Sequence, residues 1–238
     1  MTTRTRRPVP LAMTALVAFA SDVVALAVSG GHDAAAHEHG PSSPAAHALT
    51  ATHAPTAVSG KELALRQEMD RLWQEHVVWT RLAIISLTTN APDTEATVAR
   101  LLVNQTDIGN AVKPFYGGPA GNQLTALLRE HILIAADLIG VAQKGDTAGV
   151  AAQQARWATN ADEIAALLSN ANPRFWKPGP MKAMMRGHLR LTTNEVVARL
   201  QGNWAADVRA YDLIERQILH MADMLSDGLV GQFPARFA

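Results

Sequence analysis

The stretch Leu72–Arg81 reads LWQEHVVWTR, and its histidine is the first of three that recur at nearly even spacing. His131 follows His76 by 55 positions, and His188 follows His131 by 57. A period of about 55 residues indicates a supersecondary unit that is used three times. The sequence therefore predicts three related helical hairpins.

Aspartates follow these histidines at a related spacing. Asp107 and Asp162 each lie 31 positions after the preceding histidine of the set, whereas Asp212 lies 24 positions after His188. The deficit of seven residues corresponds to about two helical turns, so Asp212 would face much the same way. Each hairpin is thus expected to contribute one histidine and one aspartate.

The composition limits the possible classes of protein. With 238 residues, 48% of them hydrophobic, the chain can bury the core of one domain of about 180 residues. Twenty-one basic and 21 acidic residues leave no net charge, which gives no indication of a nucleic-acid partner or an anionic membrane surface. The sequence has no cysteine, which excludes disulfides, thiolate zinc sites, iron–sulfur clusters and thiol nucleophiles.

The N-terminal residues 1–29 have the pattern of an export signal. Three arginines precede an apolar run, Leu11–Ser29, and Ala18–Ala20 matches the A-x-A pattern of a cleavage site. The segment is expected to be a signal peptide or an uncleaved membrane anchor. Either form predicts an exported, extracytoplasmic protein, secreted or anchored to the outer face of the cytoplasmic membrane, that contacts the membrane only through this segment if it is uncleaved.

Residues 30–59 consist mainly of Gly, Ala, Pro, Ser and His, a composition typical of a flexible linker. Tracts rich in histidine can collect Zn²⁺, Cu²⁺ or Ni²⁺ loosely, although such a segment can also be a plain solvated spacer. Five of the nine histidines of the chain lie here: His32, His37, His39, His47 and His53.

Breaks rich in Asn, Gly and Pro divide the rest of the chain into six segments of helical character. The sequence shows no strand signals, and short connections within each hairpin favour antiparallel neighbours. We therefore expect an all-α fold, an antiparallel six-helix bundle of three related hairpins, in a domain spanning residues 60–238. The expected helices are Lys61–Thr88, Asp93–Val112, Asn122–Gln143, Asp146–Ser169, Met181–Leu200 and Trp204–Leu229.

The three histidines are expected to face the core. His76 lies in the middle of an apolar helical stripe that includes Met69, and His131 has equivalent surroundings. His188 lies among three methionines, with Glu195 on the same face. An unpaired polar group in a core costs about 1–3 kcal/mol, so each imidazole needs a partner, and the aspartates of the return helices are the candidates.

Two interpretations of these residues remain open. In the first, a divalent transition metal (Zn, Fe, Mn or Cu) binds in the bundle core, with the aspartates as ligands or as acceptors that fix the imidazole tautomers. In the second, each histidine only braces its own hairpin through its aspartate, and the domain is a structural or interaction module without metal. The candidate metal ligands are His76, His131, His188, Asp107, Asp162 and Asp212.

A third interpretation is a metal-dependent hydrolase, which needs an open coordination position and a general base, for which Glu195 is the nearest candidate. The sequence contains no Glu-x-x-His or His-Glu-x-x-His signature, and no catalytic residue can be assigned. It also has no phosphate-binding loop of the nucleotide-binding folds, so no nucleotide cofactor is expected.

The motifs LWxEHxxWTR, FYG, EHxxxAA, NADEIA and QFP resemble those of a group of uncharacterised bacterial exported helical proteins. In this chain the motifs are Leu72–Arg81, Phe115–Gly117, Glu130–Ala136, Asn160–Ala165 and Gln232–Pro234, and together they extend over most of residues 62–237. The resemblance implies an exported helical fold and carries no mechanism. In layout alone, without a shared motif, three inward histidines are similar to the DinB-like metal-binding bundles.

Overall fold

The computed structural model describes residues 58–238, and within this range it contains helices and turns but no strand. The predicted all-α class is confirmed for this part of the chain. Five α-helices are followed by a final 3-10 turn: α2 (Gly60–Thr89), α3 (Thr94–Gln143), α4 (Thr147–Ala171), α5 (Pro178–Leu200), α6 (Trp204–Gln232) and η1 (Pro234–Arg236).

The predicted export segment, residues 1–29, and nearly all of the predicted linker, residues 30–59, lie outside the described residues. Among the helices that are described, none is both long and apolar enough to cross a membrane.

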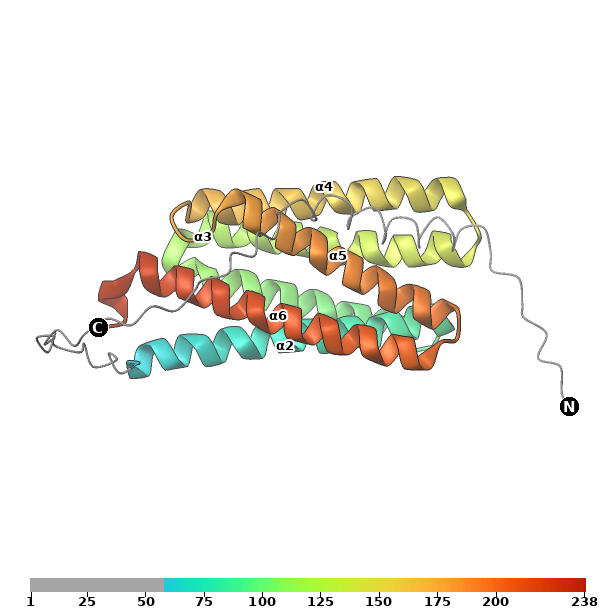
Figure 1. Cartoon of the computed structure of the whole chain (residues 1–238), viewed down its shortest axis with the longest axis horizontal. Coiled ribbons are helices and arrows are strands. Elements are labelled where there is room, and N and C mark those ends of the chain that lie inside the picture. Colours follow the sequence, from blue (N-terminus) through green and yellow to red (C-terminus); the bar gives the residue numbers. More distant parts are fainter. Residues whose placement is uncertain (1–57) are drawn as a thin grey trace, which may run out of the picture.

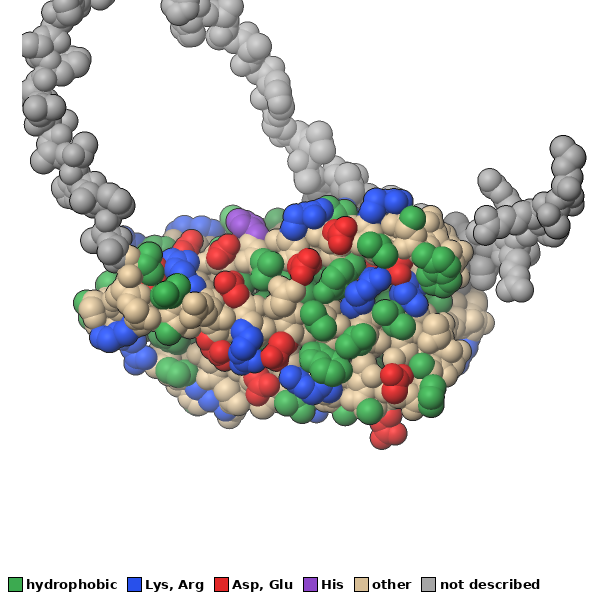
Figure 2. Space-filling model, turned by 90° about the horizontal axis from the view of Figure 1, so that it is seen from below, with side chains coloured by type: hydrophobic (Ala, Val, Ile, Leu, Met, Phe, Trp, Pro, Cys, Tyr) green, Lys and Arg blue, Asp and Glu red, His purple; other side chains and the backbone are tan. Residues whose placement is uncertain are grey.

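The helices form an elongated bundle in which their axes are roughly aligned (Figure 1). α2 packs against α3 and α6, α4 packs against α3 and α5, and α5 packs against α6. Because α6 returns to α2, the bundle closes on itself and encloses a main core, to which every α-helix contributes. On the face shown in Figure 2, acidic and basic side chains are interspersed.

Polar side chains begin three of the helices at the positions where free backbone N–H groups need acceptors. Ser59 accepts from the backbone of Glu62 at the start of α2. Asp146, the first residue of the expected helix Asp146–Ser169, accepts from the backbone N–H of Gly149 at the start of α4. Such caps each contribute about 1 kcal/mol, and they fix where a helix begins.

The segments expected as two helices, Asp93–Val112 and Asn122–Gln143, lie in one element, α3, in which two helices join across a kink. The expected break is present but takes no loop, because one residue, Gly117, provides it with φ 83° and ψ 169°. Glycine adopts positive φ without the steric clash that a side chain would cause. Figure 1 shows the chain reversing direction at this kink, so that the two halves of α3 lie antiparallel.

The two halves of α3 cross at a pair of buried glycines, Gly109 and Gly121. A Cβ atom placed on Gly121 would lie 2.6 Å from the backbone oxygen of Gly109, and one on Gly109 would lie 2.7 Å from that of Gly121. The backbones therefore touch directly, which only glycine permits at both positions.

Aromatic residues close the end of the bundle at which α3 kinks. Trp176, in the α4–α5 connection, is 1% exposed, and its Nε1 donates to the backbone oxygen of Met224 at 3.2 Å. Phe115 contacts Phe233 and Phe237, with ring centroids 5.5 and 6.1 Å apart. The connections between hairpins therefore serve as a packed cap for the core.

We expect Gly121→Ala to lower the free energy of unfolding by about 1–3 kcal/mol, because the added methyl group overlaps a backbone oxygen that cannot move aside. Urea denaturation followed by circular dichroism measures this. Gly118→Ala is the matched control, since a Cβ there meets nothing within 4 Å. Equal midpoints for the two variants would contradict the close crossing.

Candidate functional site

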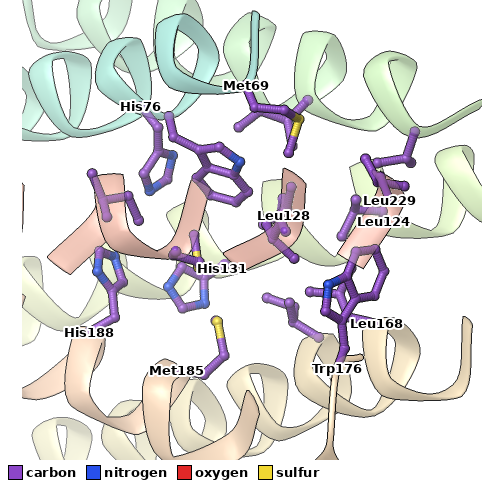
Figure 3. A pocket seen from close by; sticks show the side chains of 17 residues that line it. Met69, His76, Leu124, Leu128, His131, Leu168, Trp176, Met185, His188 and Leu229 are labelled. Carbon is purple, nitrogen blue, oxygen red and sulfur yellow. The ribbon is translucent and has the colours of Figure 1, made fainter. Parts of the chain in front are cut away.

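All three histidines lie in the core, 3%, 3% and 5% exposed for His76, His131 and His188. They come from α2, α3 and α5, and they lie at one level of the bundle (Figure 3). The ring centroid of His188 is 6.0 Å from that of His76 and 6.3 Å from that of His131. We call these three side chains the histidine layer.

In the second hairpin, one side-chain amide holds the imidazole. Nδ1 of His131 lies 2.8 Å from Oδ1 of Asn160 on α4, and Nδ2 of the same asparagine donates to the backbone oxygen of Leu127 at 3.0 Å. Leu127 stands four residues before His131, so the asparagine binds the ring and the backbone of the facing helix together.

The third hairpin repeats this arrangement with a longer side chain. Nδ1 of His188 lies 3.0 Å from Oε1 of Gln217 on α6, and Nε2 of Gln217 donates to the backbone oxygen of Met184 at 3.3 Å. Met184 again stands four residues before the histidine. We call this arrangement, an amide bound to a ring nitrogen and to that carbonyl, the amide clamp.

In the first hairpin, two adjacent amides share the same task. Asn104 on α3 donates to the backbone oxygen of Leu72, four residues before His76, at 2.9 Å. Nε2 of Gln105 lies 3.2 Å from Nδ1 of His76 and donates to Oδ1 of Asn104 at 3.0 Å. Together these two amides make both contacts of the clamp, so the clamp is present in all three hairpins and is divided between two side chains in the first.

The clamps determine where each ring carries its proton. The amide oxygens of Asn160 and Gln217 can only accept, so Nδ1 is protonated in His131 and His188, and the lone pair of each ring lies on Nε2. With the Gln105 amide oriented as it stands, His76 accepts at Nδ1 and carries its proton on Nε2. Two of the three rings thus have an Nε2 lone pair that none of the clamps uses.

The predicted aspartate partners occupy other places, and the expectation that each histidine bonds the aspartate of its hairpin was wrong. Asp162 forms ion pairs with Arg186 at 2.7 Å and Lys182 at 2.8 Å, and hydrogen bonding to Arg186 lowers the pKa of its carboxyl group. Asp212 is exposed, and Asp107 is partly exposed. Asp107 and Asp162 each stand two residues beyond a clamping amide, about 200° around the helix, and so point away from the ring.

The sequence contains a repeat spacing that identifies the observed partners of the histidines. Gln105, Asn160 and Gln217 each lie 29 residues after their histidine, and this spacing holds in all three hairpins. The spacing of 31 residues to an aspartate held in only two. Equal spacing across all three repeats could have identified the amides.

Two small cavities lie on either side of the histidine layer, and the three histidines are the only residues that line both. One, of about 30 Å³, is lined by Met69, Met185 and Met221 among aliphatic and aromatic side chains, and we call it the methionine cavity. The other, of about 40 Å³, has Thr80, Thr192 and Thr193 in its lining, and we call it the threonine cavity. Among the described residues, no Asp, Glu, Lys or Arg lines either cavity.

Several polar atoms around these cavities are buried without a hydrogen-bond partner among the described residues. Oγ1 of Thr80, Oγ1 of Thr193 and Nε1 of Trp157 belong to the lining of the threonine cavity, and Nε1 of Trp73 to that of the methionine cavity. Each cavity has room for a guest the size of one water molecule. The surroundings of the histidine layer therefore include polar atoms without partners, while the walls of the two cavities are almost entirely apolar.

Burial keeps the three imidazoles neutral. It lowers the pKa of His76 and of His131 to about 3, with a smaller contribution from the neighbouring His188, and it also lowers the pKa of His188. Neutral imidazoles present lone pairs and no positive charge at neutral pH. The layer therefore suits a cation or a hydrogen-bond donor and does not suit an anion.

Glu195, the candidate general base, lies in a separate buried cluster of charges. Its carboxylate is 2.6 Å from Arg81, which also contacts Asp207 at 3.0 Å, and Arg199 contacts Asp207 at 2.8 Å. Burial raises the pKa of Glu195 to about 7. Glu195 lines neither cavity, so its position gives no support to a catalytic role at the histidine layer.

Within residues 58–238, no three His, Asp or Glu side chains are grouped closely enough to hold a metal ion. Two imidazoles bound to one tetrahedral ion have ring centroids about 5.2 Å apart, given metal–nitrogen bonds near 2.1 Å. The observed separations of 6.0 and 6.3 Å are wider by about 1 Å. The layer is therefore not arranged as a tetrahedral zinc site.

Comparisons with protein-family models, with curated proteins and with solved structures find no match to this chain. The function must therefore be inferred from the residues of the core.

We expect the metal-free protein to lose stability as the pH falls from 6.5 towards 3. In this range the unfolded chain takes up protons on its histidines while the buried rings, with pKa values of about 3 for His76 and His131, do not. Each such histidine makes the free energy of unfolding fall by up to about 1.4 kcal/mol per pH unit. Urea denaturation at a series of pH values measures the slope.

The control for this slope is His131→Asn, because Nδ2 of asparagine takes the place of the Nδ1 donor but does not titrate. The raised pKa of Glu195 acts in the opposite direction between pH 7 and its ordinary value, and it is common to both proteins. The variant should show a shallower slope between pH 6 and 4. An unchanged slope would mean that His131 is not protected from protonation.

Proposed function

We propose that the helical domain binds one transition-metal ion at the histidine layer and that the protein works outside the cytoplasm. The observation that supports metal binding is the amide clamp, which fixes the imidazoles of His131 and His188 through Nδ1 and leaves Nε2 of each ring with a lone pair. Export is inferred from the N-terminal sequence alone. The five histidines of residues 30–59 would collect ions for the core.

The clamps have the form of the support that metal-binding histidines receive. A histidine that binds a metal through one ring nitrogen generally donates from the other to a carbonyl or carboxylate oxygen, which fixes its tautomer and orientation. Asn160 and Gln217 supply such oxygens at 2.8 and 3.0 Å. A hairpin brace requires only this hydrogen bond. A shared ion also requires that imidazole rings from different hairpins lie near each other, and the ring centroids of His131 and His188 are 6.3 Å apart.

The proposed ligand set no longer includes the aspartates. Asp162 is engaged by Arg186 and Lys182, and Asp212 lies on the surface. Binding would therefore depend on neutral side chains of the core. An ion would have to fit the observed ring separations or draw the rings together by about 1 Å.

A structural module is the second candidate, and one observation favours it. Each clamp binds a backbone oxygen as well as the ring, and so ties together the two helical segments of a hairpin at that level. A protein whose histidines only brace its hairpins would keep this interaction and bind no ion. The two candidates differ at Nε2, which a brace does not need.

The test uses the full chain with the five histidines of residues 30–59 replaced by Gln, purified without an affinity tag, so that binding outside the core is reduced. After incubation with Zn²⁺, Co²⁺, Cu²⁺ or, under reducing conditions without oxygen, Cu⁺, we expect about one equivalent of one ion to remain after dialysis. The metal content is measured by mass spectrometry of the digested protein.

The variants His131→Asn and His188→Asn should lose the ion and remain folded, because asparagine keeps the donor of the clamp and lacks Nε2. His220→Asn, at an exposed histidine of α6, is the control and should retain the ion. If the parent protein retains none of these ions, the metal proposal is wrong and the brace is the better account.

A further inference from the structure

We infer that the ion is monovalent copper, bound by Nε2 of His131 and Nε2 of His188 with the thioether sulfur of Met185 as a third ligand. This inference rests on the proposed function and specifies its ion and its ligands.

The first argument is the distance between the two rings. Two imidazoles on opposite sides of one ion, with any third ligand bound from the side, have centroids about 6.4 Å apart, whereas tetrahedral angles bring them to about 5.2 Å. His131 and His188 are 6.3 Å apart. Cu⁺ accepts two or three ligands, and Zn²⁺ in proteins almost always takes four. The separation that does not fit zinc therefore fits copper in its reduced state.

The second argument is the position of the protons. The clamps place the lone pairs of His131 and His188 on Nε2. His76 carries its proton on Nε2, because the Gln105 amide directs its N–H group at Nδ1 of that ring. The layer thus offers two nitrogen ligands and one neighbouring N–H group. Two nitrogens with one additional ligand complete the coordination of Cu⁺ but leave a divalent ion under-coordinated.

The third argument is the sulfur in the methionine cavity. Met185 stands three residues before His188 on α5, so the two side chains share one face of the helix. It is 5% exposed, and Figure 3 shows its sulfur directed toward the ring of His131. Thioether sulfur is a soft ligand that favours Cu⁺ over Zn²⁺ and over the harder divalent ions.

The fourth argument is charge. No carboxylate lines the methionine cavity or the threonine cavity, and the nearby buried carboxylates of Glu195 and Asp207 are engaged by arginines. The desolvation energy of an ion grows with the square of its charge, so a divalent ion costs about four times as much to bury as a monovalent ion of the same size. Neutral ligands in an apolar core therefore favour a single positive charge.

The test compares Cu⁺ and Zn²⁺ in the full chain whose five histidines of residues 30–59 are replaced by Gln. Under reducing, oxygen-free conditions the protein should withdraw one equivalent of Cu⁺ from its coloured complex with bicinchoninate.

Met185→Leu should weaken Cu⁺ binding at least tenfold. Met181→Leu is the matched control, because Met181 is also buried on α5 but lines neither cavity, and it should bind like the parent. X-ray absorption should show nitrogen and sulfur neighbours of copper in the parent and no sulfur in Met185→Leu.

Three outcomes would overturn the inference, and they separate it from the proposed function. Tighter binding of Zn²⁺ than of Cu⁺, or equal Cu⁺ affinity in Met185→Leu and the parent, would refute copper or its sulfur ligand and leave metal binding at the histidines intact. Failure to bind either ion would refute both. Cu⁺ binding that survives in His131→Asn would place the copper outside the histidine layer.

Discussion

The amide clamp on each core histidine is the interaction on which the arrangement of the bundle depends. A buried imidazole needs a partner, and an amide supplies one without bringing a charge into an apolar core. The backbone oxygen that the amide also binds lies four residues before the histidine, where it already accepts the N–H of its own helix and has a second lone pair free. One neutral side chain such as Asn160 therefore satisfies a ring and fixes the register of two helical segments.

The charged cluster of Arg81, Glu195, Arg199 and Asp207 complements this neutral layer two helical turns further along α5. It holds α2, α5 and α6 together by ion pairs, and its two acidic and two basic groups compensate one another. Among the described residues, both buried carboxylates lie in this cluster, which leaves the histidine layer free of carboxylates. The electrostatic character of the layer is thus a consequence of how the polar residues are divided between the two levels.

Most of the fold followed from patterns that local physics controls. Caps such as Asp146, the break at Gly117 and the apolar stripe around His76 depend on neighbouring residues in the chain, and the helix ranges derived from them were close. The shortness of the connection inside α3 was not predicted, because a single glycine takes the place of an expected loop. The partners of the histidines were not predicted, because the carboxylates of Asp107 and Asp162 were expected to accept from the imidazoles. The repeat spacing of 29 residues instead marks the amides of Gln105 and Asn160. The separation of the rings depends on where the neighbouring helices place α3 and α5 on either side of the core, which no local pattern encodes.

The depth of the histidine layer has a kinetic consequence. With every ring 5% exposed or less and both adjoining cavities about the size of a water molecule, nothing can reach the layer without displacement of helices or large side chains. Exchange of any guest is then coupled to transient opening of the bundle, whose free-energy cost is a property of the whole core. Its residence time would reflect how often the helices part as much as how strongly the guest is bound.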